Sequence, residues 1–381
     1  MGWCKLAVQL VEDEPYISHG ESEDYEMLSA PISTPLRLDH LAVWVSDMEA
    51  TTTFLTDVVG LKRHPMVVEV SDDDPTCGGM EAVFIDGNGL WLEMILPTTP
   101  GPGMDMLNEF GDGAIVEVNF EAVDKDYIDI IDDMAAKGIQ MLSMDGSPLV
   151  DGGRIDEGVR GNSESVETGQ RIAYWPTDIS GGTTIEIYEK FSADETNLLN
   201  LREAQWADEQ KDSTAPRIDR VGILVEDLEK VASFYTQTMG LTRHPEVFVL
   251  EANANNVGGM KICFIKASHT ENVWVQLIQP TSPGYAMDLL EEKGSGYPME
   301  VSVEVDDLDA FCGQMQAKGV TMVKLDGSAL DSGSKWDTVE PYGDRFCYFP
   351  LSVSRGFRMM MYQRGPRDTS MLHRRDDTFV G

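Results

Sequence analysis

The sequence predicts an α+β protein built from four βαβββ units, which form two modules with curved mixed or antiparallel sheets. Two observations predict this class. Segments of the first half recur in order about 180 positions later, so that residues 60–65 match 240–245 and residues 78–85 match 258–265. Within each copy, a strand pattern and a helical pattern ending at glycine come first, several strand patterns follow, and the whole series occurs twice.

The first unit of the first module opens with an alternating strand and continues into a helix that ends at Gly60. Three further strand patterns follow, two of them separated by a tight turn at residues 86–89. Proline and glycine at residues 97–103 predict a linker to the second unit. The predicted elements are a strand over 38–45, a helix over 48–59 and strands over 66–70, 82–85 and 90–95.

The second unit repeats this order and adds a long insertion. Residues 146–169 are rich in Gly, Ser and Asp, and we expect them to form a flexible lid or hairpin. The predicted elements are a strand over 115–122, a helix over 124–137 that Gly138 ends, and strands over 140–144, 170–175 and 183–188.

The second module is expected to follow the same plan. Its predicted elements are a strand over 218–225, a helix over 228–239, strands to residue 279, a strand over 300–305, a helix over 308–318 and strands to residue 362. The predicted domain limits are an N-terminal arm (1–34), a first module (35–190), a linker (191–215) with a helix over 195–210, a second module (216–364) and a mixed-charge tail (365–381). The tail mixes arginines with aspartates, and we expect it to be disordered.

Composition restricts the class of protein. With 42% hydrophobic and 25% charged residues, the chain has the make-up of a soluble globular protein. The sequence contains no run of about 18 apolar residues, which a membrane-spanning helix needs. Acidic residues follow the start too closely for a secretory signal, so we expect a cytoplasmic protein. The five cysteines include no C-x-x-C pair and are expected to be reduced.

The net charge of −37 excludes classes of partner. Nucleic acids and anionic membranes carry negative phosphates, which an acidic surface repels. No phosphate loop or dinucleotide pattern occurs in the sequence, so no nucleotide cofactor is expected. We expect a monomer or homodimer with a small molecule as its partner.

Short motifs connect the chain with a known superfamily. Asp39-His40 opens the pattern D-H-x-x-[IV]-x-V-x-D, Gly60-Leu61 ends the first helix, and Glu186 lies in the pattern I-E-I-x-E of the last strand. With two βαβββ units per module, these motifs resemble the vicinal oxygen chelate superfamily. Its members include glyoxalase I, methylmalonyl-CoA epimerase, extradiol dioxygenases and bleomycin-resistance proteins. The resemblance covers residues 36–190 and 216–364, and the spacing most resembles glyoxalase I and the epimerase.

The resemblance implies a divalent metal in a cup formed by the first module. It places one ligand on each of four strands: His40, Glu93, Glu117 and Glu186. It also implies that Glu186 is a ligand that doubles as catalytic base, with Glu93 or Glu117 as the opposing acid or base. The strand alternation places His40 on the inward face of its strand and Asp39 on the opposite face.

Each of these residues also has a structural interpretation. A lone inward histidine of a strand is more often a core residue, and strand carboxylates also suit a wet cavity. Buried unpaired carboxylates are costly, however, and a shared cation removes that cost. One imidazole with up to three carboxylates suits Mn²⁺, Mg²⁺, Co²⁺ or Ni²⁺, with Zn²⁺ left open, better than it suits a thiolate-type zinc site.

The same positions of the second module carry Arg220, Gln276, Glu300 and Met360. Arginine cannot ligate a metal, and methionine is a poor ligand for a hard cation. We therefore expect this module to bind no metal. It would serve as a structural partner or form a metal-free pocket in which Arg220, Gln276 and Glu300 contact a substrate. Pairing units of different modules gives a less complete ligand set, so each cup is expected to lie within one module.

The function that the resemblance implies is chemistry on a substrate with two adjacent oxygens. A metal acts as Lewis acid and a carboxylate moves the proton alpha to a carbonyl, which gives an isomerase or a lyase. The first alternative is a metal-free small-molecule binding protein of the bleomycin-resistance type. The second is a ring-cleaving or related dioxygenase, which needs two histidines and one carboxylate. Only His40 among the six histidines stands at a ligand position, which disfavours the dioxygenase.

Overall fold

The computed structural model places most of both repeats. It describes residues 36–72, 78–123, 127–143, 146–150, 154–155, 159–160, 170–189, 202, 206, 216–252, 258–267, 273–330, 337–339 and 341–378. The predicted N-terminal arm therefore lies outside the described residues. Of the predicted linker helix over 195–210, only Arg202 and Trp206 are described.

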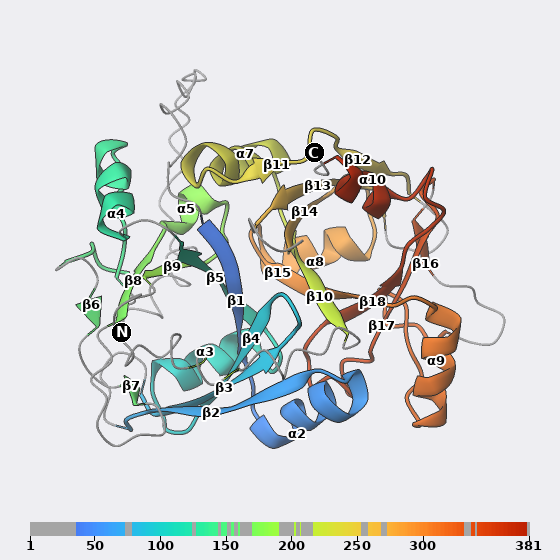
Figure 1. The fold of residues 1–381 in the computed structure, drawn as a ribbon, viewed down its shortest axis with the longest axis horizontal. Coiled ribbons are helices and arrows are strands. Elements are labelled where there is room, and N and C mark those ends of the chain that lie inside the picture. Colours follow the sequence, from blue (N-terminus) through green and yellow to red (C-terminus); the bar gives the residue numbers. More distant parts are fainter. Residues whose placement is uncertain are drawn as a thin grey trace.

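The first module forms one nine-stranded sheet, in the order β6-β8-β9-β5-β1-β4-β3-β2-β7 (Figure 1). Its strands are β1 (Leu36–Trp44), β2 (Lys62–Val70), β3 (Met80–Asp86), β4 (Trp91–Pro97), β5 (Ile115–Ala122), β6 (Arg154–Ile155), β7 (Val159–Arg160), β8 (Gln170–Tyr174) and β9 (Ile185–Glu189). Both βαβββ units contribute to this sheet, because β1 of the first unit pairs antiparallel with β5 of the second.

The second module forms a second nine-stranded sheet, in the order β11-β13-β14-β10-β15-β18-β17-β16, with β12 paired to β13. Its strands are β10 (Arg217–Leu224), β11 (Thr242–Arg243), β12 (Phe248–Leu250), β13 (Met260–Lys266), β14 (Trp274–Pro280), β15 (Pro298–Glu304), β16 (Asp337–Val339), β17 (Asp344–Tyr348) and β18 (Met359–Gln363). Here β10 pairs with β15 as β1 pairs with β5. Two mixed sheets, each uniting two units of one module, confirm the predicted α+β fold.

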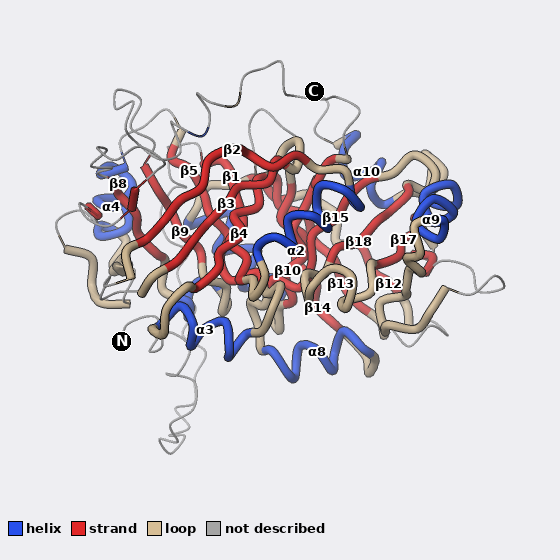
Figure 2. Tube along the Cα trace, turned by 90° about the horizontal axis from the view of Figure 1, so that it is seen from below, coloured by secondary structure: helices blue, strands red, loops and turns tan. Residues whose placement is uncertain are grey.

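The helices lie around these sheets, with α3 and α8 on the same side of the molecule (Figure 2). In the first module they are α2 (Met48–Thr53) with the π-helical turn η1 (Phe54–Val59), α3 (Pro102–Phe110), α4 (Tyr127–Ala136) and α5 (Thr177–Ser180). In the second they are α7 (Leu228–Ser233) with η4 (Phe234–Thr238), α8 (Tyr285–Lys293), α9 (Leu308–Ala317) and α10 (Met371–Asp377). None of the described helices has the length and apolar character needed to cross a bilayer.

The helix predicted over 48–59 is confirmed as α2 and η1. The Asp47 carboxylate caps its start by accepting from the amide of Ala50 at 3.0 Å. Its end is Gly60, whose φ of +95° is a left-handed conformation that glycine adopts without steric cost. Asp227 caps α7 in the same way, so the repeat extends to the helix caps.

Two local predictions were wrong. The predicted linker over 97–103 overlaps the start of α3, because Pro102 at the first helical position starts a helix rather than ending one. The predicted strand over 140–144 is absent from the described residues, where Leu142 makes only isolated bridges. Most of the insertion over 146–169 lies outside the described residues, and its strands β6 and β7 pair with β8 and β2.

The tail was also predicted wrongly as disordered. Residues 371–377 form α10, whose start is capped by Ser370, which accepts from the amide of His373 at 3.2 Å. Met371, Leu372 and Arg375 are buried. The charges that suggested disorder instead pair with one another and with the sheet.

The two modules contact each other symmetrically. The amide of Leu38 donates to the carbonyl of Ala267 at 2.7 Å, and the amide of Ile218, the counterpart of Leu38, donates to the carbonyl of Gly87 at 2.8 Å. Core residues of both modules, Leu41 and Val221 among them, belong to one hydrophobic cluster. The repeat is therefore a pseudo-two-fold pair with a shared core.

Candidate active site

Strand pairing brings the four predicted ligands to neighbouring strands of the first sheet. Ala42 of β1 stands opposite Glu93 of β4 on one side and opposite Glu117 of β5 on the other. Asn119 of β5 stands opposite Glu186 of β9. The central strands β9, β5, β1 and β4 are consecutive in the sheet, so each contributes one of the four residues.

A β-bulge in β1 changes the expected orientation of Asp39. Leu38 pairs with Phe120 and His40 pairs with Asn119, so Asp39 is an extra residue in the ladder. The prediction that alternation separates Asp39 from His40 was therefore wrong. The Asp39 carboxylate lies 2.9 Å from Nδ1 of the His40 ring, and both residues are buried.

His40 stands between two carboxylates. Its Nδ1 faces Asp39, and its Nε2 lies 3.4 Å from Oε2 of Glu93. Burial lowers the pKa of His40, but the hydrogen bonds with Asp39 and Glu93 outweigh it and raise the pKa to about 9. The ring also packs beside Tyr188, with centroids 5.7 Å apart. The surroundings of this imidazole therefore favour a positive charge on it.

Glu117 and Glu186 are carboxylates buried in the same region. The Oε1 atom of Glu117 has no hydrogen-bond partner among the described residues, although Glu117 is only 5% exposed. Burial, together with Glu186 and Glu93, raises the pKa of Glu117 well above its usual range. Burial also raises the pKa of Glu186, to about 7, although its hydrogen bond from the Tyr174 hydroxyl opposes the rise. Both shifts show that negative charge is poorly compensated here.

Sequence reasoning missed the residues that support His40. Nη1 and Nη2 of Arg202 donate to the carboxylate of Asp39, at 2.9 and 2.8 Å. The guanidinium also lies over the rings of Trp91 and Phe84, at 4.6 and 5.1 Å. A signal was present in the sequence, because residues 199–202 (L-N-L-R) resemble residues 372–375 (L-H-R-R). Because residues 191–215 were predicted to be a linker, this similarity was not used to predict a buried arginine.

The corresponding place in the second module is a cavity of about 70 Å³. Arg220 donates through Nε to Gln276 at 2.6 Å and through Nη1 to Asp219 at 3.0 Å. The Tyr348 hydroxyl donates to Glu300 at 2.7 Å, and burial raises the pKa of Glu300. Arg220, Gln276, Glu300 and Met360 all line the cavity, as predicted for equivalent positions, together with apolar side chains.

The donor set of the first module suits a divalent cation chemically. Three carboxylates and one imidazole are hard or borderline ligands, and the buried partnerless oxygen of Glu117 is an unused one. Within the described residues, however, no group of three or more His, Cys, Asp or Glu side chains has a geometry ready to hold a metal ion. Glu93 contacts His40 and Tyr174 contacts Glu186, so these side chains would have to reorient.

Comparison with known proteins identifies the sequence family. Two models described as Glyoxalase/Bleomycin resistance protein/Dioxygenase superfamily match residues 37–143 and 219–335. No curated protein sequence matches the chain.

Solved structures are similar to the chain at low sequence identity, and the fold is shared with the first of those named here. A mutant of 4-hydroxymandelate synthase from Streptomyces coelicolor is 15% identical, over 87% of this chain and 94% of that one, with a TM-score of 0.55. The 2,3-dioxygenase LapB from Pseudomonas sp. KL28 is 16% identical, over 87% and 92%, with a TM-score of 0.44. Methylmalonyl-CoA epimerase from Mycobacterium tuberculosis is 19% identical, over 39% and 89%, with a TM-score of 0.31.

Proposed function

Because the chain belongs to the Glyoxalase/Bleomycin resistance protein/Dioxygenase superfamily, we propose that its first module is a divalent-metal-dependent isomerase or lyase site. One observation carries the proposal. Three buried or half-buried glutamates and one buried histidine gather on four consecutive strands, and an oxygen of Glu117 has no partner in the part of the chain that the structure describes. Such a group is costly without a compensating cation, and a metal supplies that charge.

His40, Glu93, Glu117 and Glu186 would hold the metal. When bound, the metal supplies Lewis-acid chemistry, which polarises a substrate carbonyl and acidifies the adjacent C–H. Mn²⁺, Mg²⁺, Co²⁺, Ni²⁺ and Zn²⁺ all accept such ligands. The substrate class is a small molecule with two adjacent oxygens.

Glu186 is the proposed proton acceptor. A general base must lie within reach of the proton that it removes, and Glu186 is buried on β9, one of the four consecutive strands of the site. The Tyr174 hydroxyl binds its Oε2, which leaves Oε1 for a substrate proton. Glu93, on the far side of His40 from Asp39, is the proposed group that returns a proton. Removal of a proton and its return elsewhere gives isomerisation, and its return after bond cleavage gives a lyase.

The dioxygenase alternative has less support from the described histidines. His64 is committed elsewhere, because its Nε2 contacts the carbonyl of Arg202 at 2.9 Å and its Nδ1 accepts from the amide of Met66 at 3.0 Å. His40 is the one described histidine on the four central strands of the first sheet.

Metal binding tests the proposal directly. Metal-stripped protein would be titrated with Mn²⁺ by calorimetry, beside His40→Ala and Glu186→Gln. We expect one Mn²⁺ per chain in the unmodified protein and loss of most affinity in both variants, since each removes a ligand. Glu300→Gln is the matched control, because it changes the counterpart of Glu117 in the second module. Equal Mn²⁺ binding by His40→Ala and the unmodified protein would sink the proposal.

A second candidate function belongs to the second module. Its cavity is walled mainly by apolar side chains and is also lined by Arg220, which suits a small aromatic acid without a metal. Benzoate is the probe, and calorimetry measures its binding. We expect saturable binding that disappears in Met360→Trp, which fills the cavity, and persists in His40→Ala. Binding that is unchanged in Met360→Trp would exclude this pocket.

A further inference from the structure

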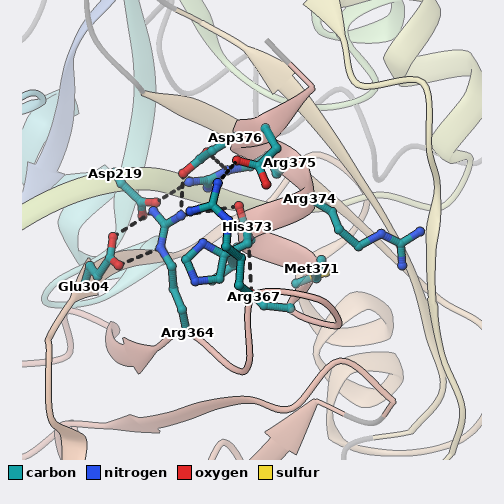
Figure 3. Close-up of polar contacts among 12 residues, drawn as sticks. Asp219, Glu304, Arg364, Arg367, Met371, His373, Arg374, Arg375 and Asp376 are labelled. Carbon is teal, nitrogen blue, oxygen red and sulfur yellow. Dashed lines mark hydrogen bonds and ion pairs between the residues drawn. The ribbon is translucent and has the colours of Figure 1, made fainter. Parts of the chain in front are cut away.

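In the second module, α10 packs against the sheet and buries the side chain of Arg375 there. Figure 3 shows Arg375 pointing toward Asp219, with Asp376 and Arg364 beside it. Nη2 of Arg375 lies 3.0 Å from Asp219, and its guanidinium lies over Trp274 and Phe264, at 4.9 and 5.3 Å. Arg375 is fully buried.

Arg202 makes the same contacts in the first module. It binds Asp39, the counterpart of Asp219, and lies over Trp91 and Phe84, the counterparts of Trp274 and Phe264. It too is fully buried. We name Arg202 with Trp206 the first closing segment and α10 the second.

In each module, a histidine ring contacts a backbone carbonyl of the closing segment. Nε2 of His64 contacts the carbonyl of Arg202 at 2.9 Å, and Nε2 of His244 contacts the carbonyl of Arg374 at 3.4 Å and the hydroxyl of Thr378 at 2.8 Å. Each ring also accepts a backbone hydrogen bond two residues ahead. The repeated unit therefore includes its closing segment.

The two modules differ in the neighbouring side chain that the buried aspartate, Asp39 or Asp219, binds. Asp219 binds the guanidinium of Arg220, a side chain with no role as a ligand. Asp39 binds Nδ1 of His40, and the other ring nitrogen of His40 faces Glu93. A chain of contacts therefore runs from Arg202 through Asp39 to the candidate metal-binding nitrogen.

We propose that Asp39 and Arg202 are positioning residues that hold His40 with Nδ1 engaged and Nε2 turned toward Glu93. The inference rests on the proposed function and adds two residues to it. A carboxylate can only accept at Nδ1, so that nitrogen keeps its hydrogen. Nε2 is the nitrogen that is available to a cation once its own hydrogen is lost. Asp39 is buried, and two hydrogen bonds from a planar guanidinium fix its orientation.

The variant that tests the proposal must remove both charges together. Asp39→Asn alone would remove the carboxylate that binds Arg202 and leave the buried positive charge of Arg202 in place, which destabilises strongly. The double variant Asp39→Asn with Arg202→Met removes the pair at nearly constant volume. The double variant Asp219→Asn with Arg375→Met is its matched control, because it removes the equivalent pair from the second module.

The first measurement uses metal-free protein. The Nδ1–H proton of His40, identified by its absence in His40→Ala, should give a downfield proton resonance protected from exchange with water. We expect this resonance in the unmodified protein and in the second-module double variant, and its loss from the first-module double variant. Its absence from the unmodified protein, or its persistence in the first-module double variant, would overturn the proposal.

The second measurement is Mn²⁺ affinity. Loss of an outer partner of a histidine ligand weakens metal binding by about 10- to 100-fold, and we expect that loss only in the first-module double variant. An unchanged affinity in that variant would contradict the positioning role. If the unmodified protein binds no Mn²⁺ while the resonance behaves as expected, the proposed metal function fails and the positioning of His40 by Asp39 and Arg202 stands.

Discussion

Replacing Arg375 by methionine is expected to lower the free energy of unfolding by about 3 to 5 kcal/mol, the range for breaking one side of a buried ion pair. The side chain is fully buried, and it donates to Asp219 at 3.0 Å and to Asp376 at 2.7 Å. It also lies over Trp274 and Phe264. Arg220 still contacts Asp219 in the variant, so the cost should fall near the lower end of the range.

Urea unfolding followed by far-ultraviolet circular dichroism measures this cost. Arg367→Met is the control, because the side chain of Arg367 is 74% exposed and pairs with Asp377 at the surface of the same segment. An exposed pair contributes about 0 to 1 kcal/mol. If Arg375→Met lowers the free energy of unfolding by less than about 1 kcal/mol, the view that the buried charge of Arg375 stabilises the packing of α10 is refuted.

Three further predictions concern pH, backbone and buried charge. Burial raises the pKa of Asp219, but Arg220 and Arg375 outweigh it and lower this pKa below its ordinary 3.8. The ionised Asp219 carboxylate therefore stabilises the fold fully above pH 3.8, and this stabilisation is lost as the pH falls through the lower pKa of the folded state. Unfolding measured against Asp219→Asn should show the difference between the two proteins shrinking below about pH 4. Gly113→Ala should lower the free energy of unfolding by more than about 1 kcal/mol, since Gly113 has a φ of +77° and a Cβ there would meet the backbone of Phe357. Gly138→Ala is the control and should lose less, because Gly138 has a φ of +76° with no described atom close to a Cβ. Equal losses of the two variants in urea unfolding would argue against a tight interface at Gly113. Glu117→Gln should raise the unfolding free energy of metal-free protein by about 1 to 3 kcal/mol by removing a partnerless buried charge, while weakening Mn²⁺ binding in calorimetry; a loss of stability instead would mean that the charge is already compensated.

The fold could be predicted largely from local patterns. Alternation and glycine stops located the central strands, the first helix of each module and the duplication, because a repeat confirms each element twice. The missed helix α3 begins at Pro102 beside two glycines, a composition that a linker shares. The bulge at Asp39 was beyond local reasoning, because it depends on how Leu38 and His40 pair with another strand.

The candidate site was predictable where ligands lie on strands. His40, Glu93, Glu117 and Glu186 occupy consecutive strands in the described structure, although their role as ligands stays a prediction. Arg202 was missed because its partner Asp39 is 163 positions away. Only packing joins such positions, and no periodicity in a segment of mixed polarity indicates which charged residue will be buried.

The reciprocal hydrogen bonds of Leu38 with Ala267 and of Ile218 with Gly87 have a consequence for how the two halves can change. The contact has the self-complementary pattern of a two-fold dimer, yet both halves belong to one polypeptide. In a dimer of identical subunits, every substitution appears in both sites at once. In this chain the equivalent of His40 could become Arg220 without loss of the first site, so the fusion makes one half free to specialise while the other preserves the shared core.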